Sequence, residues 1–183
     1  MYSYSHELNP TKGWFSPYAL DKTVDVAADS AEVIMGSVCS LNSSGKLQLG
    51  LEKNAVPLFA LSEIQMHTGA GPAGGMANIS GHMSGRFYKP LALQPSAARR
   101  VLCLVALGAY ELETTEFIAG TYVPNQALTS AAPGETNAGK LVAGEYYTDT
   151  ICGAVSDGVE VNNHSKSVLR FWPLFVPATA GSI

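Results

Sequence analysis

Short apolar stretches bounded by turn-forming residues are the feature that most constrains what this chain can fold into. Leu47, Leu49 and Leu51 alternate with polar residues and glycine, the period of two that places one face of a β-strand against a core. Comparable stretches recur along the chain as TVDVAAD, VPLFALS, TICGAVS and VLRFWPLFVP. Because no stretch carries the long period of an amphipathic helix, the sequence predicts an all-β fold, in the form of a small β-barrel or a jelly-roll-like sandwich.

Local turn chemistry supports the same prediction. Asn42-Ser43-Ser44-Gly45 lies between VIMGSVCSL and KLQLGL, so these two segments are predicted to form a hairpin with a glycine-bearing turn. The apolar run RVLCLVALG fits a buried helix or a buried strand, and the alternation in the following YELETTEF segment favours the strand. Residues 68–85 are too rich in glycine for a regular element and are predicted to form a long surface loop.

The chain is predicted to be one domain with an arm. Residues 1–22 hold five aromatic side chains among Asn, Pro, Ser and Lys and show no sustained period, so we expect an extended N-terminal arm. Residues 23–183 are expected to form a single all-β domain. Aromatic residues on an arm either pack on their own domain or dock onto a neighbouring protein, and docking onto a neighbour is the interpretation we favour.

An internal similarity indicates two related β units within that domain. Residues 45–63 (GKLQLGLEKNAVPLFALSE) and 139–157 (GKLVAGEYYTDTICGAVSD) align without gaps. The identical positions are the initial Gly-Lys-Leu, Gly50 with Gly144, Ala60 with Ala154, and Ser62 with Ser156. Self-similarity of this kind indicates a repeated supersecondary unit, and the two units are expected at about residues 36–63 and 121–157.

The charge of the chain argues against one class of partner. Charged residues make up 14% of the sequence, the formal net charge is −4, and Arg99-Arg100 is the only adjacent basic pair. A nucleic-acid-binding surface needs clustered basic residues to neutralise phosphates, so no nucleic-acid partner is expected. So few charges imply a surface rich in Ser, Thr, Asn and Gly, or a surface covered by partner proteins.

Targeting and membrane signals are weak. The N-terminal segment MYSYSHELNPTKGWF lacks the apolar core of a signal peptide, and the longest apolar run is about half the length of a membrane span. Cys39, Cys103 and Cys152 lie far apart in apolar stretches without C-x-x-C spacing, so they are predicted to be buried thiols. We therefore expect a chain made in a reducing cytoplasm, with no membrane partner.

Motifs for nucleotide and metal chemistry are also weak. Residues 69–74 (GAGPAG) match the dinucleotide fingerprint, but Pro72 interrupts the helix that must receive the pyrophosphate. No pair with ligand spacing occurs among the four histidines, His6, His67, His82 and His164. We expect no cofactor, no metal ion and no catalytic residue, and hence a protein that is not an enzyme.

One acidic cluster resembles the carboxylate sets used in acid–base catalysis. It consists of Glu111, Glu113 and Glu116. On a strand, Glu111 and Glu113 share one face, and glycosidases use paired carboxylates of this type. The interpretation we favour is a solvated strand face or a row of salt bridges between subunits.

Several segments, in order along the chain, resemble the capsid decoration (cement) proteins of tailed bacteriophages. MGSVCSLNSSGKLQLG followed by VPLFALS is similar to the strand–turn–strand segment of that family. The later similar segments are ALGAYELETTEF, TYVPNQALTS, GKLVAG, ICGAVSDG and VLRFWPLFVP. The resemblance covers roughly Gly36–Pro177, and its segments are structural, so no catalytic residues carry over.

This resemblance implies a structural virion protein on the outer surface of an assembled icosahedral capsid. Its implied partners are the major capsid protein and further copies of itself, with a trimer favoured over a dimer. We expect the apolar anchors to come from the arm and the C-terminal strand: Trp14, Phe15, Tyr18, Phe171 and Trp172. Packing in the core is the alternative role for Phe171 and Trp172.

Two other classes of protein remain as alternatives. One is another virion part, such as a tail, head-fibre or head-completion protein. The other is a carbohydrate- or receptor-binding β module, which would expose aromatic platforms beside Asp or Asn residues.

Overall fold

The structure, a computed structural model, describes residues 8–13, 21–25, 33–64, 92–93, 100–105, 110–163 and 165–179. The regular elements in these ranges are β-strands, and no helix occurs among them. The predicted all-β fold is therefore confirmed. The Gly-rich segment predicted as a loop, residues 68–85, lies outside the described residues.

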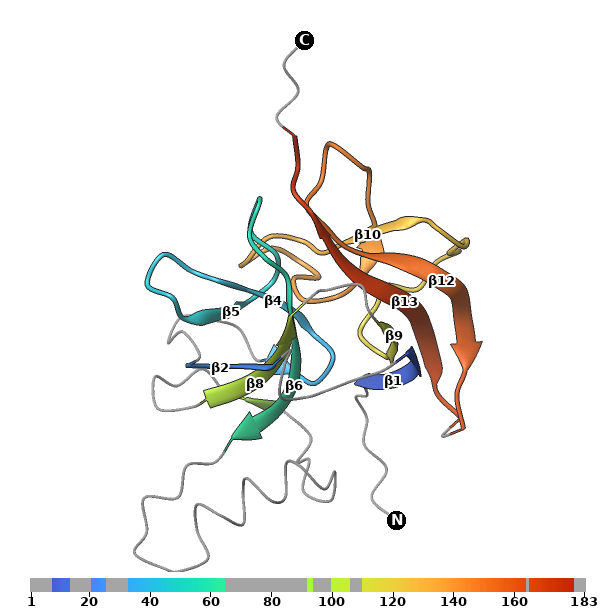
Figure 1. Ribbon diagram of the computed structural model, residues 1–183, viewed down its shortest axis with the longest axis horizontal. Helices are drawn as coiled ribbons and strands as arrows, with labels where there is room; N and C mark the ends of the chain where they lie inside the picture. Colours follow the sequence, from blue (N-terminus) through green and yellow to red (C-terminus); the bar gives the residue numbers. More distant parts are fainter. Residues whose placement is uncertain are drawn as a thin grey trace, which may run out of the picture.

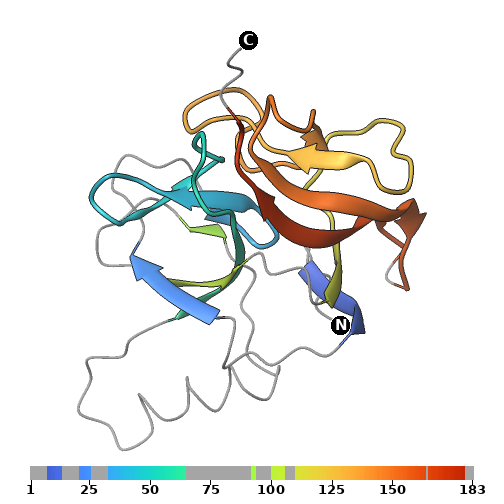
Figure 2. The ribbon, with the colours of Figure 1, turned by 45° about the horizontal axis from the view of Figure 1, so that its top comes forward.

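The strands form two main antiparallel sheets that lie side by side (Figures 1 and 2). The six-stranded sheet has the order β1 (Leu8–Gly13), β9 (Tyr110–Thr114), β13 (Ser167–Val176), β12 (Ile151–Val161), β10 (Ala127–Thr129) and β11 (Val142–Ala143). The five-stranded sheet has the order β2 (Asp21–Asp25), β8 (Arg100–Val105), β6 (Leu58–Ile64), β4 (Val38–Leu41) and β5 (Leu47–Leu49). A separate ribbon pairs β3 (Val33–Ile34) with β7 (Ala92–Leu93). Among the described strands, no pairing joins the two edges of either sheet, so both sheets are open.

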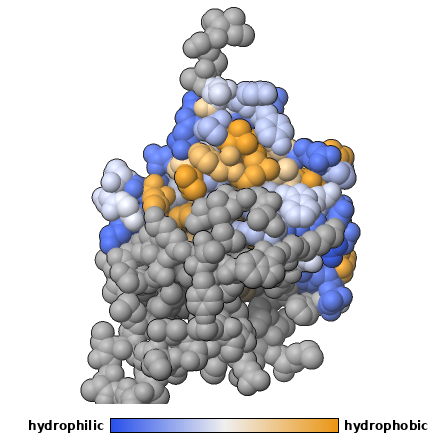
Figure 3. Space-filling model, viewed as in Figure 1, coloured by the Kyte–Doolittle hydropathy of each residue, from blue (hydrophilic) through white to orange (hydrophobic). Residues whose placement is uncertain are grey.

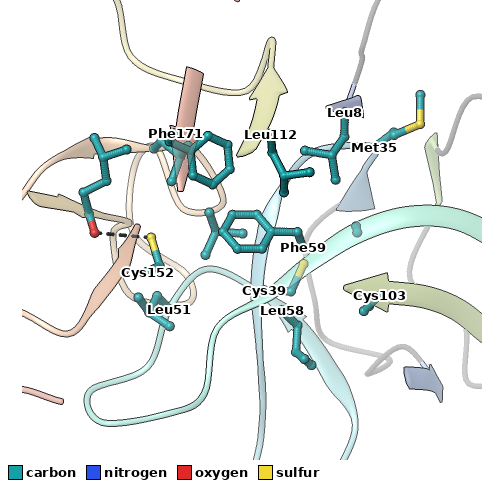
Figure 4. Packing of buried hydrophobic residues seen from close by; sticks show 14 of the residues in the cluster. Leu8, Met35, Cys39, Leu51, Leu58, Phe59, Cys103, Leu112, Cys152 and Phe171 are labelled. Atoms are coloured by element: carbon teal, nitrogen blue, oxygen red, sulfur yellow. Dashed lines mark hydrogen bonds between the residues drawn. The ribbon is translucent and has the colours of Figure 1, made fainter. Parts of the chain in front are cut away.

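One hydrophobic core joins the two sheets. Phe59 of β6 and Phe171 of β13 are both fully buried, and their ring centroids lie 5.2 Å apart at an interplanar angle of 45°. Tilted aromatic pairs at this separation are favourable beyond the area they bury. Figure 4 shows the two rings beside each other, with Leu112 of β9 nearby. Because the contact crosses from one sheet to the other, it holds the two sheets as one body.

The two main sheets share one strand order. In the five-stranded sheet the chain passes through β2, β4, β5, β6 and β8, and the spatial order is β2-β8-β6-β4-β5. In the six-stranded sheet the chain passes through β9, β10, β11, β12 and β13, and the spatial order is β9-β13-β12-β10-β11. The two paths are the same when strands are matched in chain order. The six-stranded sheet differs by the addition of β1 at the free edge of β9.

Backbone details also recur at matching places. The Gly36 N–H donates to the Ala60 carbonyl at 2.8 Å, and the Asn125 N–H donates to the Val155 carbonyl at 2.8 Å. Gly36 and Asn125 both have positive φ, at 90° and 68°. The strand register shifts after Ala60 in β6 and after Val155 in β12. The structural partner of Ala60 is thus Val155, one residue beyond the Ala154 that the gapless sequence alignment gives.

The predicted hairpin at residues 42–45 is confirmed. It joins β4 to β5, which pair in antiparallel orientation. The Asn42 side-chain oxygen accepts hydrogen bonds from the Ser44 N–H at 3.0 Å and the Lys46 N–H at 2.9 Å. Gly45 adopts a φ of 71°, a left-handed conformation that glycine reaches without steric cost. The strand prediction for the RVLCLVALG run is confirmed over β8.

The N-terminal segment is not an arm throughout. Residues 8–13 form β1, whose Leu8 is 5% exposed and part of the core, and residues 21–25 form β2 at the edge of the other sheet. The predicted boundary at residue 22 is therefore wrong for these two stretches, because each supplies an edge strand to the body. Residues 1–7 and 14–20 of the predicted arm lie outside the described residues.

Candidate functional site

The two predicted C-terminal anchors lie on opposite faces of β13. Phe171 is fully buried and packs on Phe59, so its proposed role as a surface anchor is wrong and its core role is correct. Trp172 is partly exposed and lies opposite Ala154 of β12, so its role as an anchor stays a prediction. The other predicted anchors, Trp14, Phe15 and Tyr18, lie outside the described residues.

Hydrophobic side chains do reach the surface beyond Trp172. Leu174, Phe175 and Val176 are partly exposed, and Figure 3 shows hydrophobic side chains gathered over the C-terminal half of β13. This stretch lies next to the start of β12, since Ile151 pairs with Val176.

The acidic cluster is buried, so the prediction of a solvated strand face is wrong. Glu111 is 0% exposed, Glu113 is 8% exposed and Glu116 is 5% exposed. Glu111 accepts hydrogen bonds from the hydroxyls of Thr11 on β1 and Ser156 on β12. Buried carboxylates need such donors because an unpaired charge loses its hydration without compensation. The Glu111 carboxylate therefore ties an edge strand and β12 to β9.

Arg170 extends this polar network within the chain. It lies directly across from Glu113 in the β9–β13 pair, with Arg170 Nε 3.5 Å from Glu113 Oε2. Its Nη1 lies 2.7 Å from Glu160 Oε2 on β12. The partly exposed guanidinium thus sits between carboxylates from both neighbouring strands. These ion pairs join strands of the same chain, so they are not the row of salt bridges between subunits that the sequence predicted.

The predicted burial of the three cysteines is confirmed. Cys39, Cys103 and Cys152 are free thiols with no exposed surface. Burial raises the pKa of the Cys39 and Cys152 thiols well above their usual range. Both therefore stay protonated at neutral pH, and a protonated thiol is neither a nucleophile nor a metal ligand.

Within the described residues, no group of three or more His, Cys, Asp or Glu side chains could hold a metal ion. The histidine predictions are not tested, because His6, His67, His82 and His164 lie outside those residues. In the same part of the chain, no helix is long and apolar enough to cross a membrane.

A pocket of about 330 Å³ lies where the segment before β4 meets the loop between β10 and β11. Its walls carry the carboxylates of Glu116 and Glu135, the ammonium group of Lys140, and the apolar side chains of Ile34 and Leu49. Neither a cysteine nor a histidine contributes to its described walls. The pocket therefore places groups of both charges beside an apolar wall.

Large hydrophobic side chains that are strongly exposed fall into two groups in the described chain. One group is Val56, Tyr146 and Tyr147, at 47%, 42% and 72% exposure. The second, the valine group, is Val123, Val159 and Val161, at 55%, 42% and 70% exposure. The first group lies in the loops before β6 and β12. In the second group, Val159 and Val161 belong to the C-terminal part of β12, and Val123 belongs to the loop before β10, which bonds to Val155 in the middle of β12. Val159 and Val161 lie eight and ten residues beyond Ile151, the first residue of β12, so the two groups lie toward opposite ends of that strand.

The first group belongs to two loops in contact, here named the paired-loop surface: residues 50–57, between β5 and β6, and residues 144–150, between β11 and β12. The Asn54 N–H donates to Thr150 Oγ1 at 2.7 Å, which joins one loop to the other. Sequence reasoning missed this surface. The sequence does carry a signal for it: two adjacent tyrosines, Tyr146 and Tyr147, stand in an otherwise polar turn segment, where core residues are not expected.

Comparison with protein-family models, with curated protein sequences and with solved structures found no significant match. The site is therefore interpreted from the residues of this chain.

Proposed function

We propose that the chain is a structural virion protein that binds the outer surface of an assembled icosahedral phage capsid and bridges its capsomers. One observation carries this function: a body whose two sheets share one core exposes two apolar groups toward opposite ends of its longest strand, β12. A bridging protein needs two contact surfaces on one body that does not bend between them. The sequence resemblance over residues 36–177 supports the same role.

Contacts in the interior join the parts of the body. The Phe59–Phe171 contact joins the sheets, and the Glu111 and Arg170 networks cross β1, β9, β12 and β13. A body that does not deform transmits force between the two neighbours it touches. Even modest contacts then add strongly when many copies engage one lattice.

Self-association belongs to the same proposal. Exposed aliphatic side chains such as Val123 and Val161 are typical of surfaces that partners cover. We expect a homotrimer, with a dimer as the second choice. Sedimentation equilibrium of the purified chain measures this directly, and a monomer at capsid-like concentrations would contradict it.

The decisive experiment mixes the purified chain with expanded, DNA-free shells of the major capsid protein encoded in the same genome. We expect saturable, stoichiometric binding and a rise in the temperature at which the shells come apart. The rise follows because a ligand that binds only the assembled state stabilises that state. Shells that neither retain the protein nor gain stability would rule the function out.

A further inference from the structure

The two loops of the paired-loop surface are structural equivalents of each other. One loop follows β5 and the other follows the equivalent strand, β11. Each loop begins with a glycine whose N–H bonds back to the strand that precedes β5 or β11, namely β4 or β10. The Gly50 N–H donates to the Val38 carbonyl at 3.0 Å, and the Gly144 N–H donates to the Ala127 carbonyl at 2.9 Å. The shared strand order therefore brings the same loop of each unit to one place on the molecule.

The loop of residues 144–150 is held in a fixed shape. Asp149 Oδ2 accepts from the Glu145 N–H at 2.8 Å, and the Asp149 N–H donates to the Glu145 carbonyl at 3.0 Å. The Thr150 carbonyl accepts from Thr129 Oγ1 at 2.8 Å. Side chains presented by such a loop lose little conformational entropy when a partner binds.

Tyr147 adopts a backbone conformation that is costly for a bulky residue. Its φ is 74°, in the left-handed region, which costs a bulky residue roughly 1 kcal/mol or more. Tyr147 is 72% exposed, so burial within the chain returns little of that cost. Strained residues concentrate at sites of binding, and tyrosine is a frequent centre of protein–protein interfaces.

The charge of the same surface indicates the kind of partner. Its charged residues are Glu52, Lys53, Glu145 and Asp149, three acids and one base, for a net of −2. Net negative charge in the loops that carry Val56, Tyr146 and Tyr147 is complementary to a protein surface on which Lys or Arg side chains lie beside apolar ones. The aliphatic Val56, at 47% exposure, favours a protein partner over a sugar, which stacks on aromatic rings.

We propose that the paired-loop surface is where this protein docks on the assembled capsid, against a patch of capsid surface that carries Lys or Arg side chains, with Tyr147 as the central contact. This inference rests on the proposed function and assigns a surface to it. A lattice of identical subunits presents equivalent elements at every junction. Two equivalent loops placed together suit a junction of this kind, because each loop meets an equivalent element.

The test compares two substitutions that make the same backbone change. Tyr147→Gly removes the ring and relieves the positive φ. Asn137→Gly is the matched control, because Asn137 is exposed and has a φ of 67° in a loop outside the paired-loop surface. Both variants should unfold at or above the temperature of the unmodified protein. Against expanded, DNA-free shells, Tyr147→Gly should bind about 10- to 100-fold more weakly, and Asn137→Gly should bind like the unmodified protein.

A second pair of variants tests the charge. Glu145→Lys should slow association several-fold at low salt, and the difference should shrink at high salt. Glu135→Lys, an exposed acid elsewhere, should have little effect. Tyr147→Gly binding shells as tightly as the unmodified protein would overturn the inference while leaving the proposed function standing. Displacement from shells by free mono- or oligosaccharides would overturn it in favour of glycan binding. Failure of the unmodified protein to bind would overturn both.

Discussion

At the scale of single residues, glycines fix how closely the two sheets' loops approach. Gly50 has a φ of 104°, and a β-carbon added there would lie 2.9 Å from both the Ala131 carbonyl oxygen and the Pro133 nitrogen. Both obstacles are backbone atoms that cannot rotate away. The Leu51 N–H also donates to the Ala131 carbonyl at 3.0 Å. The loop after β10 is thus packed against the end of β5 through a position where only glycine fits.

Replacement of Gly50 should therefore destabilise the protein strongly. Gly50→Ala combines the left-handed backbone cost of about 1–2 kcal/mol with overpacking of about 1–3 kcal/mol, so we expect a loss of roughly 3 kcal/mol or more. Gly45→Ala is the control, since Gly45 has a φ of 71° with nothing within 4 Å, and it should lose only the backbone part. Urea unfolding measures both, and equal losses would show that the close approach at Gly50 is not rigid.

At the scale of elements, the sequence predicts strands well and the location of polar side chains poorly. The alternation of Leu47 and Leu49 and the Asn42 turn correctly predict β4 and β5, because both signals are local. The prediction of a solvated face for Glu111 was wrong because the hydrogen bonds that allow its burial come from Thr11 and Ser156, on strands far away in the sequence. Strand β1 was missed for a similar reason: its segment shows no alternation of apolar and polar residues, and its pairing partner, β9, lies far along the chain.

The place of β1 in the six-stranded sheet gives a prediction for the N-terminal segment. Deletion of residues 1–13 should lower the free energy of unfolding by roughly 3 kcal/mol or more. It removes the buried Leu8 and the hydrogen bond that the Thr11 hydroxyl donates to Glu111. Thr11→Val should cost about 1 kcal/mol, and Thr11→Ser should be near neutral. Thermal and urea unfolding measure these changes. A deletion variant as stable as the full chain would show that the segment behaves as the free arm expected from sequence.

At the scale of the whole molecule, the equivalent strand order of the two sheets raises the question of whether they fold separately. Hydrogen bonds between the two sheets indicate that they do not. The Val38 N–H donates to the Gly139 carbonyl at 2.8 Å, and the Leu51 N–H donates to the Ala131 carbonyl. The first bond joins strand β4 of one sheet to a loop of the other, and the second joins a loop of one sheet to a loop of the other. The gapless repeat indicated two similar units, but sequence similarity carries no information on how such units pack together.

The shared core therefore predicts one cooperative unfolding transition. Phe171→Ala removes a fully buried ring from the contact with Phe59 and should cost about 3–5 kcal/mol. Because the ring serves both sheets, hydrogen exchange should accelerate equally in slow amides of β4 and β12, and circular dichroism should show a single melting step at lower temperature. Val161→Ala, at a 70% exposed position on β12, should change neither. Faster exchange confined to the six-stranded sheet, or two separate melting steps, would mean that the two sheets are independent folding units that merely touch.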